Sequence, residues 1–301
     1  MPRIKQAGYE LNQSPFYCLK SKKNLASLLQ ISQSKLNNLT RSEELYIEEN
    51  RFDKKRGKIR HIEEPKPDLK RVQKRIKNLL TRIQLPNYVH APAQGHSHIG
   101  NAKAHVGAVV VRSLDIEKYF PSTPAKSIFW FFYKQMKCSS DVAGILTKLS
   151  TFKGYLPTGS PLSPILSYFS HIDMWETIGE IVRNASCTLT LYMDDVTISG
   201  NSVSGELIWE VKKQFHHCGL RSNKKKEKYY FRKNSYEITG IIVTKEGELK
   251  VPNRQHLKTH QIRQELHCET EPKKCKKLRQ RLQGLEAQIQ QVKRVNYPLP
   301  E

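Results

Sequence analysis

Apolar residues recur along the first part of the chain at the spacing of amphipathic helices. Residues 23–31 show this spacing, and residues 68–80 repeat it with Lys and Arg side chains on the opposite face. We expect Asp68 to cap the second helix, which ends before Pro86. Between the two helices, residues 56–62 are typical of a turn followed by a short alternating strand.

The middle of the chain alternates strand and helix patterns. Residues 107–115 form an apolar run that predicts a buried strand ending in an aspartate, and residues 125–149 are predicted to be helical. A Pro-rich loop then enters an apolar helix that continues to about Val182. Residues 189–200 have two alternating arms, which predict a hairpin that turns at a pair of aspartates.

The last part of the chain is strand-like at first and then helical and basic. Residues 228–251 predict short antiparallel strands, and residues 254–301 predict helix. Apolar residues from Leu278 to Val292 repeat at alternating spacings of four and three. Because this repeat is short, we expect it to pack on its own domain rather than in a coiled-coil dimer. The whole pattern predicts an α+β protein.

The charge is strongly unbalanced, since 51 Lys and Arg face 28 Asp and Glu for a net +23. Such an excess favours a polyanionic partner, with nucleic acid first and an anionic membrane surface second. The hydrophobic share of 38% is enough for a core and excludes global disorder. No apolar stretch could span a bilayer and the start lacks a signal core, so we expect a cytoplasmic protein. Six cysteines without a Cys-x-x-Cys pair argue against a disulfide framework or a zinc ribbon.

Three aspartates stand where strands are predicted to end. Asp115 closes an apolar strand, while Asp194 and Asp195 are adjacent at a hairpin tip, where they repel each other and cap no helix. A divalent cation removes that repulsion, and two Mg²⁺ ions held in this way support in-line phosphoryl transfer. An exposed, inert Asp-Asp turn is the alternative that the hairpin alone leaves open.

Four segments that carry these residues follow one another in order: 113–122, 156–164, 192–195 and 219–226. In their order and spacing the sequence resembles reverse transcriptases, and the resemblance runs from about residue 58 to residue 251.

Two shorter elements narrow the resemblance to the bacterial retron reverse transcriptases. Asn101-Ala-Lys-Ala-His105 is similar to their Asn-Ala-x-x-His element. Ile238-Thr-Gly240 is similar to their Val-Thr-Gly element, with Ile for Val.

The resemblance implies a right-hand polymerase fold of the α+β class, with fingers, a palm built on an antiparallel sheet, and a small helical thumb. Residues 1–107 then form an N-terminal segment and the fingers, residues 108–252 the palm with a finger-like insertion around 125–160, and residues 253–301 the basic thumb. After residue 251 only 50 residues remain, too few for a ribonuclease H or endonuclease domain. Template removal is therefore expected to come from another protein, such as a host ribonuclease H.

The resemblance also assigns the chemistry. It implies that Asp115, Asp194 and Asp195 are ligands of two Mg²⁺ ions and that the backbone carbonyl of Ile116 adds another ligand. It makes Lys226 the general acid that protonates the departing pyrophosphate. A run of three lysines leaves that last register open by one residue.

Nucleotide-binding roles are implied for five residues. Lys58 and Arg60 would reach the triphosphate, and the ring of Phe120 would exclude a 2′-hydroxyl and so favour deoxynucleotides. Thr158 and Gly159 would approach the sugar, although Thr158 stands where many relatives have Gln, which weakens that contact. A core ring for Phe120 and a solvated basic surface for Arg60 are the alternatives.

RNA binding is implied for Asn101 and His105, which organise the loop of the family-specific element. It is also implied for Lys274, Lys277 and Arg281 in the basic thumb.

The implied function is RNA-directed DNA polymerase of a retron. A partner non-coding RNA would be both template and primer, and extension of a guanosine 2′-hydroxyl with dNTPs would give branched multicopy single-stranded DNA. Anti-phage defence with an accessory effector protein is part of that implication. The alternatives are another bacterial reverse transcriptase, of the group II intron or abortive-infection type, and a catalytically silent RNA-binding scaffold.

Overall fold

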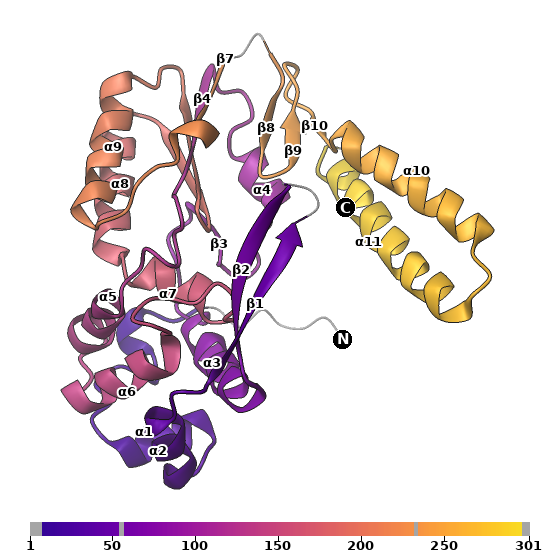
Figure 1. Cartoon of the computed structure of the whole chain (residues 1–301). Coiled ribbons are helices and arrows are strands. Elements are labelled where there is room, and N and C mark those ends of the chain that lie inside the picture. Colours follow the sequence, from indigo (N-terminus) through magenta and orange to yellow (C-terminus); the bar gives the residue numbers. More distant parts are fainter. Residues whose placement is uncertain (1–7, 54–56, 232–233, 297–301) are drawn as a thin grey trace.

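A five-stranded sheet occupies the middle of the molecule in the computed structural model, which describes residues 8–53, 57–231 and 234–296 (Figure 1). Its strands lie in the order β3 (Val89–Ala91), β5 (Thr188–Tyr192), β6 (Asp195–Gly200), β4 (Val110–Asp115) and β7 (Lys228–Phe231). All neighbours are antiparallel except β3 and β5, which are parallel. The antiparallel sheet expected from the sequence therefore gains one parallel edge strand.

Strand alternation gives the β5–β6 hairpin two different faces. One face is apolar and belongs to the main core, together with α8 (Ile172–Asn184) and α9 (Gly205–His217), which lie beside the sheet in Figure 1. The other face carries Thr190, Thr197 and Ser199, and each of these residues is only 2% exposed. Buried hydroxyls need hydrogen-bond partners, so something polar must cover this second face.

The N-terminal part is mainly helical. After a single 3₁₀ turn (Leu11–Gln13), α1 (Lys22–Leu29) and α2 (Gln33–Arg41) pack with α3 (Pro67–Leu80) and α6 (Ser140–Ser150). From this helical group the β1 (Tyr46–Asp53) and β2 (Lys58–Pro65) hairpin extends upward in Figure 1.

The start of α3 differs from the prediction. Pro67 is the first helical residue and Lys66 is the N-cap, without any side-chain hydrogen bond to the helix. Asp68 lies inside the first turn and its carboxylate accepts a bond from Lys35 at 2.7 Å. The capping role expected for Asp68 is therefore wrong, because proline at the first helical position fixes the helix start two residues earlier.

Two stretches expected to be continuous helices are divided. Residues 125–149 contain α5 (Ala125–Trp130), a π-helical turn (Phe131–Gln135) and, after a break, α6. Lys137 has a φ of 52°, in the left-handed region, which ends the first helical run. The apolar helix after the Pro-rich loop is likewise two helices, α7 (Ser163–Phe169) and α8.

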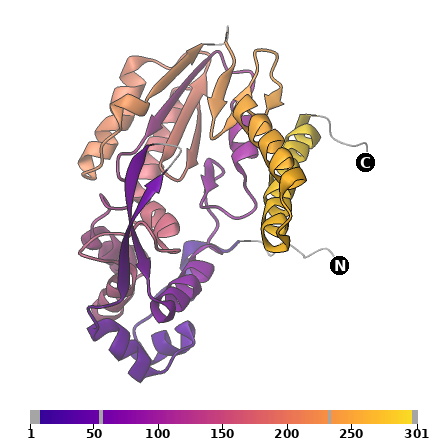
Figure 2. The same ribbon diagram turned by 45° about the vertical axis from the view of Figure 1, so that its right-hand side comes forward.

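A second, smaller core joins the C-terminal elements to the sheet. The strands β8 (Tyr236–Ile238), β9 (Ile241–Val243) and β10 (Leu249–Lys250) form a three-stranded sheet that contacts α4 (His98–Lys103). Two helices, α10 (Asn253–Cys268) and α11 (Pro272–Asn296), follow as an antiparallel helix pair that projects away from the sheets (Figures 1 and 2).

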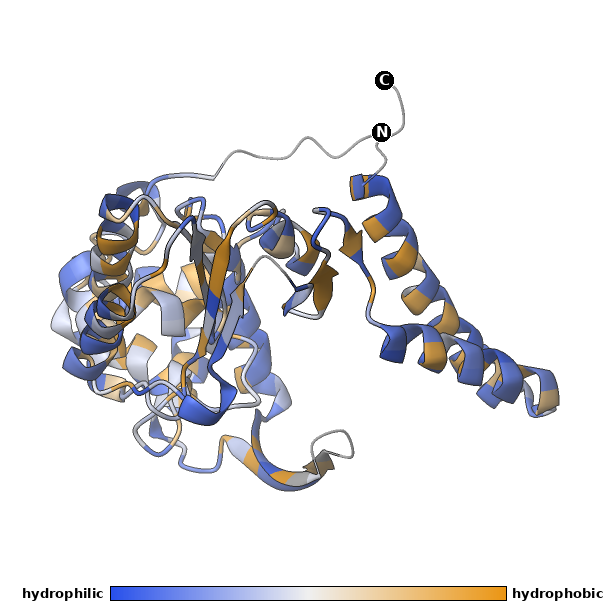
Figure 3. Cartoon of the chain, turned by 90° about the horizontal axis from the view of Figure 1, so that it is seen from above, coloured by the Kyte–Doolittle hydropathy of each residue, from blue (hydrophilic) through white to orange (hydrophobic). Residues whose placement is uncertain are grey.

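The apolar stripe of α11 packs within the chain, as predicted. Its upper part joins the second core, where Val292 is 3% exposed, and the rest is half-buried beside α10. Hydrophilic and hydrophobic residues alternate along both helices of the pair (Figure 3). Within the three described ranges, no helix is both long and apolar enough to cross a membrane.

Candidate active site

Strand pairing brings the three predicted aspartates to one end of the central sheet. Asp115, the last residue of β4, lies directly opposite Asp195, the first residue of β6. Asp194 immediately precedes it in the hairpin turn, and its backbone carbonyl accepts a bond from the Ile116 amide at 2.9 Å. The turn itself is formed by Met193 and Asp194, one residue earlier than expected, because Asp195 already pairs with Tyr192.

The turn is anchored from both neighbouring strands. The Met193 amide donates to the carbonyl of Ala91 at the end of β3, at 3.0 Å. Met193 has a φ of 58°, a left-handed conformation that is unfavourable for a side chain of this size. The two anchors therefore hold a strained turn that presents adjacent carboxylates.

The carboxylates strongly influence one another. Burial, followed by the charges of Asp194 and Asp115, raises the pKa of Asp195 to about 6. Asp195 remains open to solvent even though many protein atoms surround its carboxylate, whereas Asp115 is only 6% exposed. Such an arrangement of acids favours the binding of a cation.

One cation of the protein already contacts this group. The Lys226 ammonium donates to both carboxylate oxygens of Asp115, at 2.7 and 2.6 Å. Lys226 ends a short 3₁₀ helix, Lys224–Lys226, that begins after Asn223, and the Asn223 amide donates to the backbone carbonyl of Asp115 at 2.8 Å. Of the three lysines in the run, Lys226 is therefore the one bonded to Asp115, and its role as the general acid stays a prediction.

The donor set fits Mg²⁺, which prefers carboxylate and carbonyl oxygens. Asp115, Asp194 and Asp195 would supply carboxylates, and the carbonyl of Ile116 receives no backbone hydrogen bond within the described residues. In the described ranges, only Glu48, His61 and Glu63 bring ligand atoms within 4.8 Å of one another, so the three aspartates are more widely spaced. Asp115, Asp194, Asp195 and the Ile116 carbonyl would be the groups to hold an ion at this site, next to the ammonium of Lys226.

The segment that carries Thr158 and Gly159 is clamped to β2. Glu63, 2% exposed, accepts bonds from the Tyr155 hydroxyl at 2.5 Å and from the Thr158 amide at 3.2 Å. The Thr158 hydroxyl donates to the His61 carbonyl at 3.0 Å. A Cβ on Gly159 would lie 2.5 Å from the Glu63 carbonyl oxygen. Gly159 thus allows a close backbone approach to β2, whereas its expected approach to the sugar stays a prediction.

The remaining nucleotide-binding candidates lie on β2 and after β4. Arg60 is exposed on β2, directly opposite Arg51 of β1, while the side chain of Lys58 lies outside the described part. Phe120 is half-buried against the main core, with its ring 6.1 Å from that of Tyr119. The roles of these residues toward a nucleotide stay predictions.

The RNA-binding candidates fall into two groups. Lys274, Lys277 and Arg281 are exposed on α11, where spacings of three and four place them on one side of the helix. Asn101 and His105 are each 1% exposed, so these two side chains do not reach a ligand at the surface, and the role expected of them in organising the loop stays a prediction. Both instead make hydrogen bonds inside the protein.

Sequence reasoning missed the residues that support this site. Glu63 holds the 155–159 segment on β2, and Thr190 and Ser199 bind His105. The signal for the last two was present, since hydroxyl residues alternate with apolar ones along both arms of the hairpin. The sequence gives no comparable signal for Glu63, because two consecutive glutamates are usually found on the surface, whereas Glu63 is buried.

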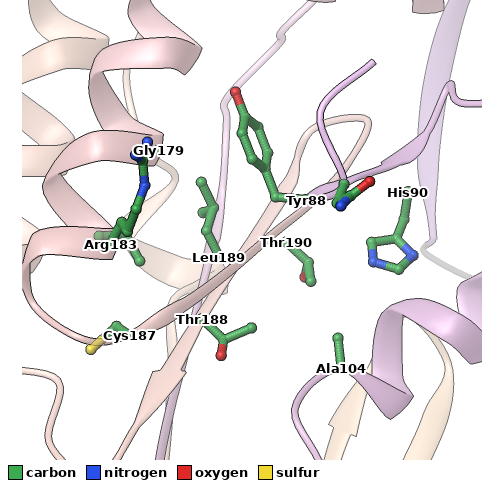
Figure 4. Close-up of a pocket in the computed structure, with 11 residues that line it drawn as sticks. Tyr88, His90, Ala104, Gly179, Arg183, Cys187, Thr188, Leu189 and Thr190 are labelled. Atoms are coloured by element: carbon green, nitrogen blue, oxygen red, sulfur yellow. The ribbon is translucent and has the colours of Figure 1, made fainter. Parts of the chain in front are cut away.

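A surface cavity of about 340 Å³ lies at the opposite end of β5 from the aspartates (Figure 4). Tyr88, His90, Arg183 and Thr190 are among its lining residues. None of the site residues predicted from the sequence lines this cavity. Thr190 lines it and also forms a hydrogen bond with His105.

Comparison with known proteins gives one family. The profile of the family described as reverse transcriptase (RNA-dependent DNA polymerase) matches residues 52–243, more than half of the chain.

The curated relatives are retron enzymes. The retron Se72 reverse transcriptase of Salmonella heidelberg is 29% identical over 196 residues, which cover 64% of this chain and 52% of the relative. The retron Ec86 reverse transcriptase of Escherichia coli is 26% identical over 208 residues, which cover 67% of this chain and 63% of the relative. The retron Mx65 reverse transcriptase of Myxococcus xanthus is 25% identical over 256 residues, which cover 78% of this chain and 59% of the relative. The chain thus spans between about half and just under two thirds of these relatives.

Among solved structures, a telomerase from Candida albicans in complex with a fragment of telomeric RNA aligns with 71% of this chain and 47% of its own. The TM-score is 0.48 and the identity 12%, a likeness too distant to support an inference.

Proposed function

The chain belongs to the reverse transcriptase (RNA-dependent DNA polymerase) family, and from this premise we propose that it copies RNA into DNA. The observation that carries the proposal is the meeting of Asp115, Asp194 and Asp195 at one sheet end, inside the matched residues. An inert Asp-Asp turn needs no third aspartate directly opposite it. It also needs no buried anchor such as the bond from the Ile116 amide.

The three aspartates and the Ile116 carbonyl are proposed to hold two Mg²⁺ ions. Bound ions of this kind lower the pKa of the attacking hydroxyl and stabilise the leaving pyrophosphate. Asp195, with its pKa of about 6, is ionised near neutral pH and can then act as a ligand. Lys226 would leave Asp115 when an ion binds, and its ammonium would then be close enough to donate a proton to the leaving group.

The nucleotide is proposed to lie between the β2 segment and the aspartates. Lys58 and Arg60 would contact the triphosphate, Phe120 would exclude the 2′-hydroxyl, and Thr158 and Gly159 would lie near the sugar. The clamp between Glu63 and the Thr158 amide supports this arrangement, because it fixes the 158–159 backbone against the strand that carries Arg60.

The polynucleotide is proposed to bind across the basic surface of the helix pair, through Lys274, Lys277 and Arg281. In this assignment residues 1–107 are fingers, residues 108–252 palm and residues 253–301 thumb. The net charge of +23 supports a nucleic acid partner.

The finer proposal is a retron enzyme, which the names of the curated relatives support. A partner non-coding RNA would supply template and a priming 2′-hydroxyl, and the product would be branched single-stranded DNA. An accessory effector in anti-phage defence, a host ribonuclease H and a bacterial cytoplasmic location complete this proposal.

The test is to co-express the chain with its neighbouring non-coding RNA, purify the complex, and add dNTPs and Mg²⁺. We expect DNA whose link to RNA survives ribonuclease treatment as a branched nucleotide. The Asp194→Asn/Asp195→Asn variant should bind the RNA and make no DNA, while Asp141→Asn, on the exposed side of α6, should behave like wild type. RNA that stays tightly bound to a wild-type chain making no DNA would instead identify a silent scaffold.

A further inference from the structure

His105 lies on the polar face of the hairpin that carries Asp194 and Asp195. Its Nδ1 is 2.6 Å from the Ser199 hydroxyl on β6, and its Nε2 is 2.7 Å from the Thr190 hydroxyl on β5. The single ring therefore joins both arms of the hairpin. Thr190 lies four residues before Asp194, and Ser199 lies four residues after Asp195.

Asp195 lies on this same face of the sheet. Asp195, Thr197 and Ser199 alternate along β6 and so point to one side, away from α8 and α9. Ser199, which bonds His105, lies four residues along the strand from Asp195. At about 3.3 Å per residue the two residues are about 13 Å apart. His105 thus cannot touch the reacting atoms, but it bonds to both of the strands that present them.

The imidazole of His105 can keep both hydrogen bonds at physiological pH; these two bonds, to Ser199 and Thr190, are called the tie below. Burial, with a smaller effect of His90, lowers the pKa of His105 to about 3, so the imidazole is neutral at physiological pH. A neutral ring has one donor and one acceptor, and each hydroxyl can serve as the opposite partner. The tie is therefore satisfied without any change of protonation.

His105 is itself held by the small C-terminal sheet. The Tyr236 hydroxyl donates to the backbone carbonyl of His105 at 2.6 Å. Asn101, on the preceding helix α4, donates to the Thr239 hydroxyl at 3.2 Å, and that hydroxyl donates to the His98 carbonyl at 3.1 Å. Thr239 and Gly240 have φ values of 46° and 84°, as a two-residue hairpin turn with both residues left-handed requires.

The same helix contacts the helix pair. The Gln288 amide of α11 is 2.7 Å from His98 Nε2, and Val292 packs with Ile99 and Ala102 of α4 in the second core. Asn296 at the end of α11 bonds the backbone of Leu249 through both its amide atoms, at 3.0 and 2.7 Å. A continuous set of contacts thus runs from α11 through α4 to His105 and the hairpin.

We propose that His105 is a positioning residue, which fixes the Asp194–Asp195 hairpin relative to α4 and, through α4, to the helix pair. The inference rests on the proposed polymerase function. It assigns the Asn101-to-His105 element a task inside the protein, the positioning of metal ligands, and not contact with RNA.

The test compares His105→Ala, His105→Gln, Thr190→Val and Ser199→Ala with wild type and with Thr188→Val. Thr188 is an exposed hydroxyl on the same strand with no bond to His105, so its variant is the matched control. Three quantities are measured on purified, folded chains: Mn²⁺ affinity by electron paramagnetic resonance, affinity for a primed RNA template, and kcat and KM for dNTP.

For His105→Ala we expect Mn²⁺ binding at least fivefold weaker and kcat at least tenfold lower, with template affinity within twofold of wild type. Thr190→Val and Ser199→Ala each remove one bond and should show smaller losses of the same kind, even if His105→Ala fails to fold. His105→Gln keeps a donor and an acceptor and should recover part of the loss. Thr188→Val should match wild type.

Two results overturn the proposal. One is loss of template affinity with Mn²⁺ affinity and kcat unchanged, which would indicate an RNA-recognition role. The other is wild-type Mn²⁺ affinity in all His105, Thr190 and Ser199 variants. If wild type makes no DNA, the polymerase function fails, whereas the Mn²⁺ comparison still decides whether the tie positions the carboxylates.

Discussion

The Lys226 ammonium lies 2.7 and 2.6 Å from the two carboxylate oxygens of Asp115. A divalent ion at Asp115 would bind the same two oxygens to which Lys226 donates, and its charge would repel the ammonium, so we expect Lys226 to compete with the metal for Asp115. Asp115 is 6% exposed, and removal of its partner would leave a buried charge without compensation.

The first prediction concerns this competition. Lys226→Ala should lower the Mn²⁺ dissociation constant by about threefold to tenfold, since about 1 kcal/mol corresponds to a fivefold change. The same variant should lower kcat, because the proposed proton donor is lost. Mn²⁺ titration and single-nucleotide addition at saturating Mg²⁺ measure the two effects.

Lys225→Ala is the matched control, because Lys225 lies in the same 3₁₀ helix and is not bonded to Asp115. Unchanged metal affinity in Lys226→Ala would show that the ion pair does not compete with the ion.

The second prediction concerns pH. Burial and the neighbouring acids raise the pKa of Asp195 to about 6, so its ionised fraction falls as pH drops below that value. DNA synthesis should therefore decline below about pH 6, and the midpoint should move to lower pH as Mg²⁺ is raised, because the ion binds only the ionised carboxylate. If the midpoint of the pH dependence of DNA synthesis did not change with Mg²⁺ concentration, Asp195 would be ruled out as the titrating ligand.

The third prediction concerns stability without metal. The pKa of Asp195 is higher in the folded chain, about 6, than the ordinary aspartate value of 3.8. The protonated form therefore stabilises the fold fully below about pH 3.8, and this contribution is lost as pH rises through 6. Asp195→Asn should raise the unfolding free energy at pH 8 by on the order of 1 kcal/mol, a value discounted because the carboxylate reaches solvent.

The measurement is a pair of thermal unfolding curves at pH 8 and pH 4, with Asp141→Asn as control. The gain from Asp195→Asn should shrink at pH 4, where wild type is already protonated. An equal gain at both values would contradict the assigned pKa.

The fourth prediction concerns the clamp on β2. Gly159→Ala places a Cβ 2.5 Å from the Glu63 carbonyl oxygen, a distance that forces the 155–159 segment off the strand. We expect KM for dNTP to rise at least tenfold with a lower Tm. Gly144→Ala, in α6 with nothing within 4 Å of the added carbon, should leave KM unchanged and slightly raise the Tm. A wild-type KM for dNTP in Gly159→Ala would show that the contact between the 155–159 segment and β2 does not contribute to nucleotide binding.

The aspartates could be located from the sequence, whereas most of the contacts that support them could not. Asp115, Asp194 and Asp195 could be placed together because the order and spacing of the segments that carry them resemble those of reverse transcriptases, and the pairing of Asp115 with Asp195 brings these segments to one end of the sheet. The sequence predicts that Asn101 and His105 organise a loop, but their partners Thr239, Ser199 and Thr190 are distant in sequence and are identified only by the folded structure.

Details of local geometry also depended on tertiary contacts. The division of residues 125–149 follows from the left-handed Lys137, which no periodicity reveals. The reason for glycine at position 159 is the Glu63 backbone, which lies almost a hundred residues away in sequence.

The most direct measurement is extension of a DNA primer on an RNA template by the purified chain, with dNTPs and Mg²⁺. Wild type should add deoxynucleotides in the order that the template dictates. Asp115→Asn and Asp194→Asn/Asp195→Asn should reduce the rate by at least a thousandfold while template affinity stays within twofold, and Asp141→Asn should match wild type. Template-directed synthesis that persists in the aspartate variants would contradict the central claim that these three carboxylates form the active site.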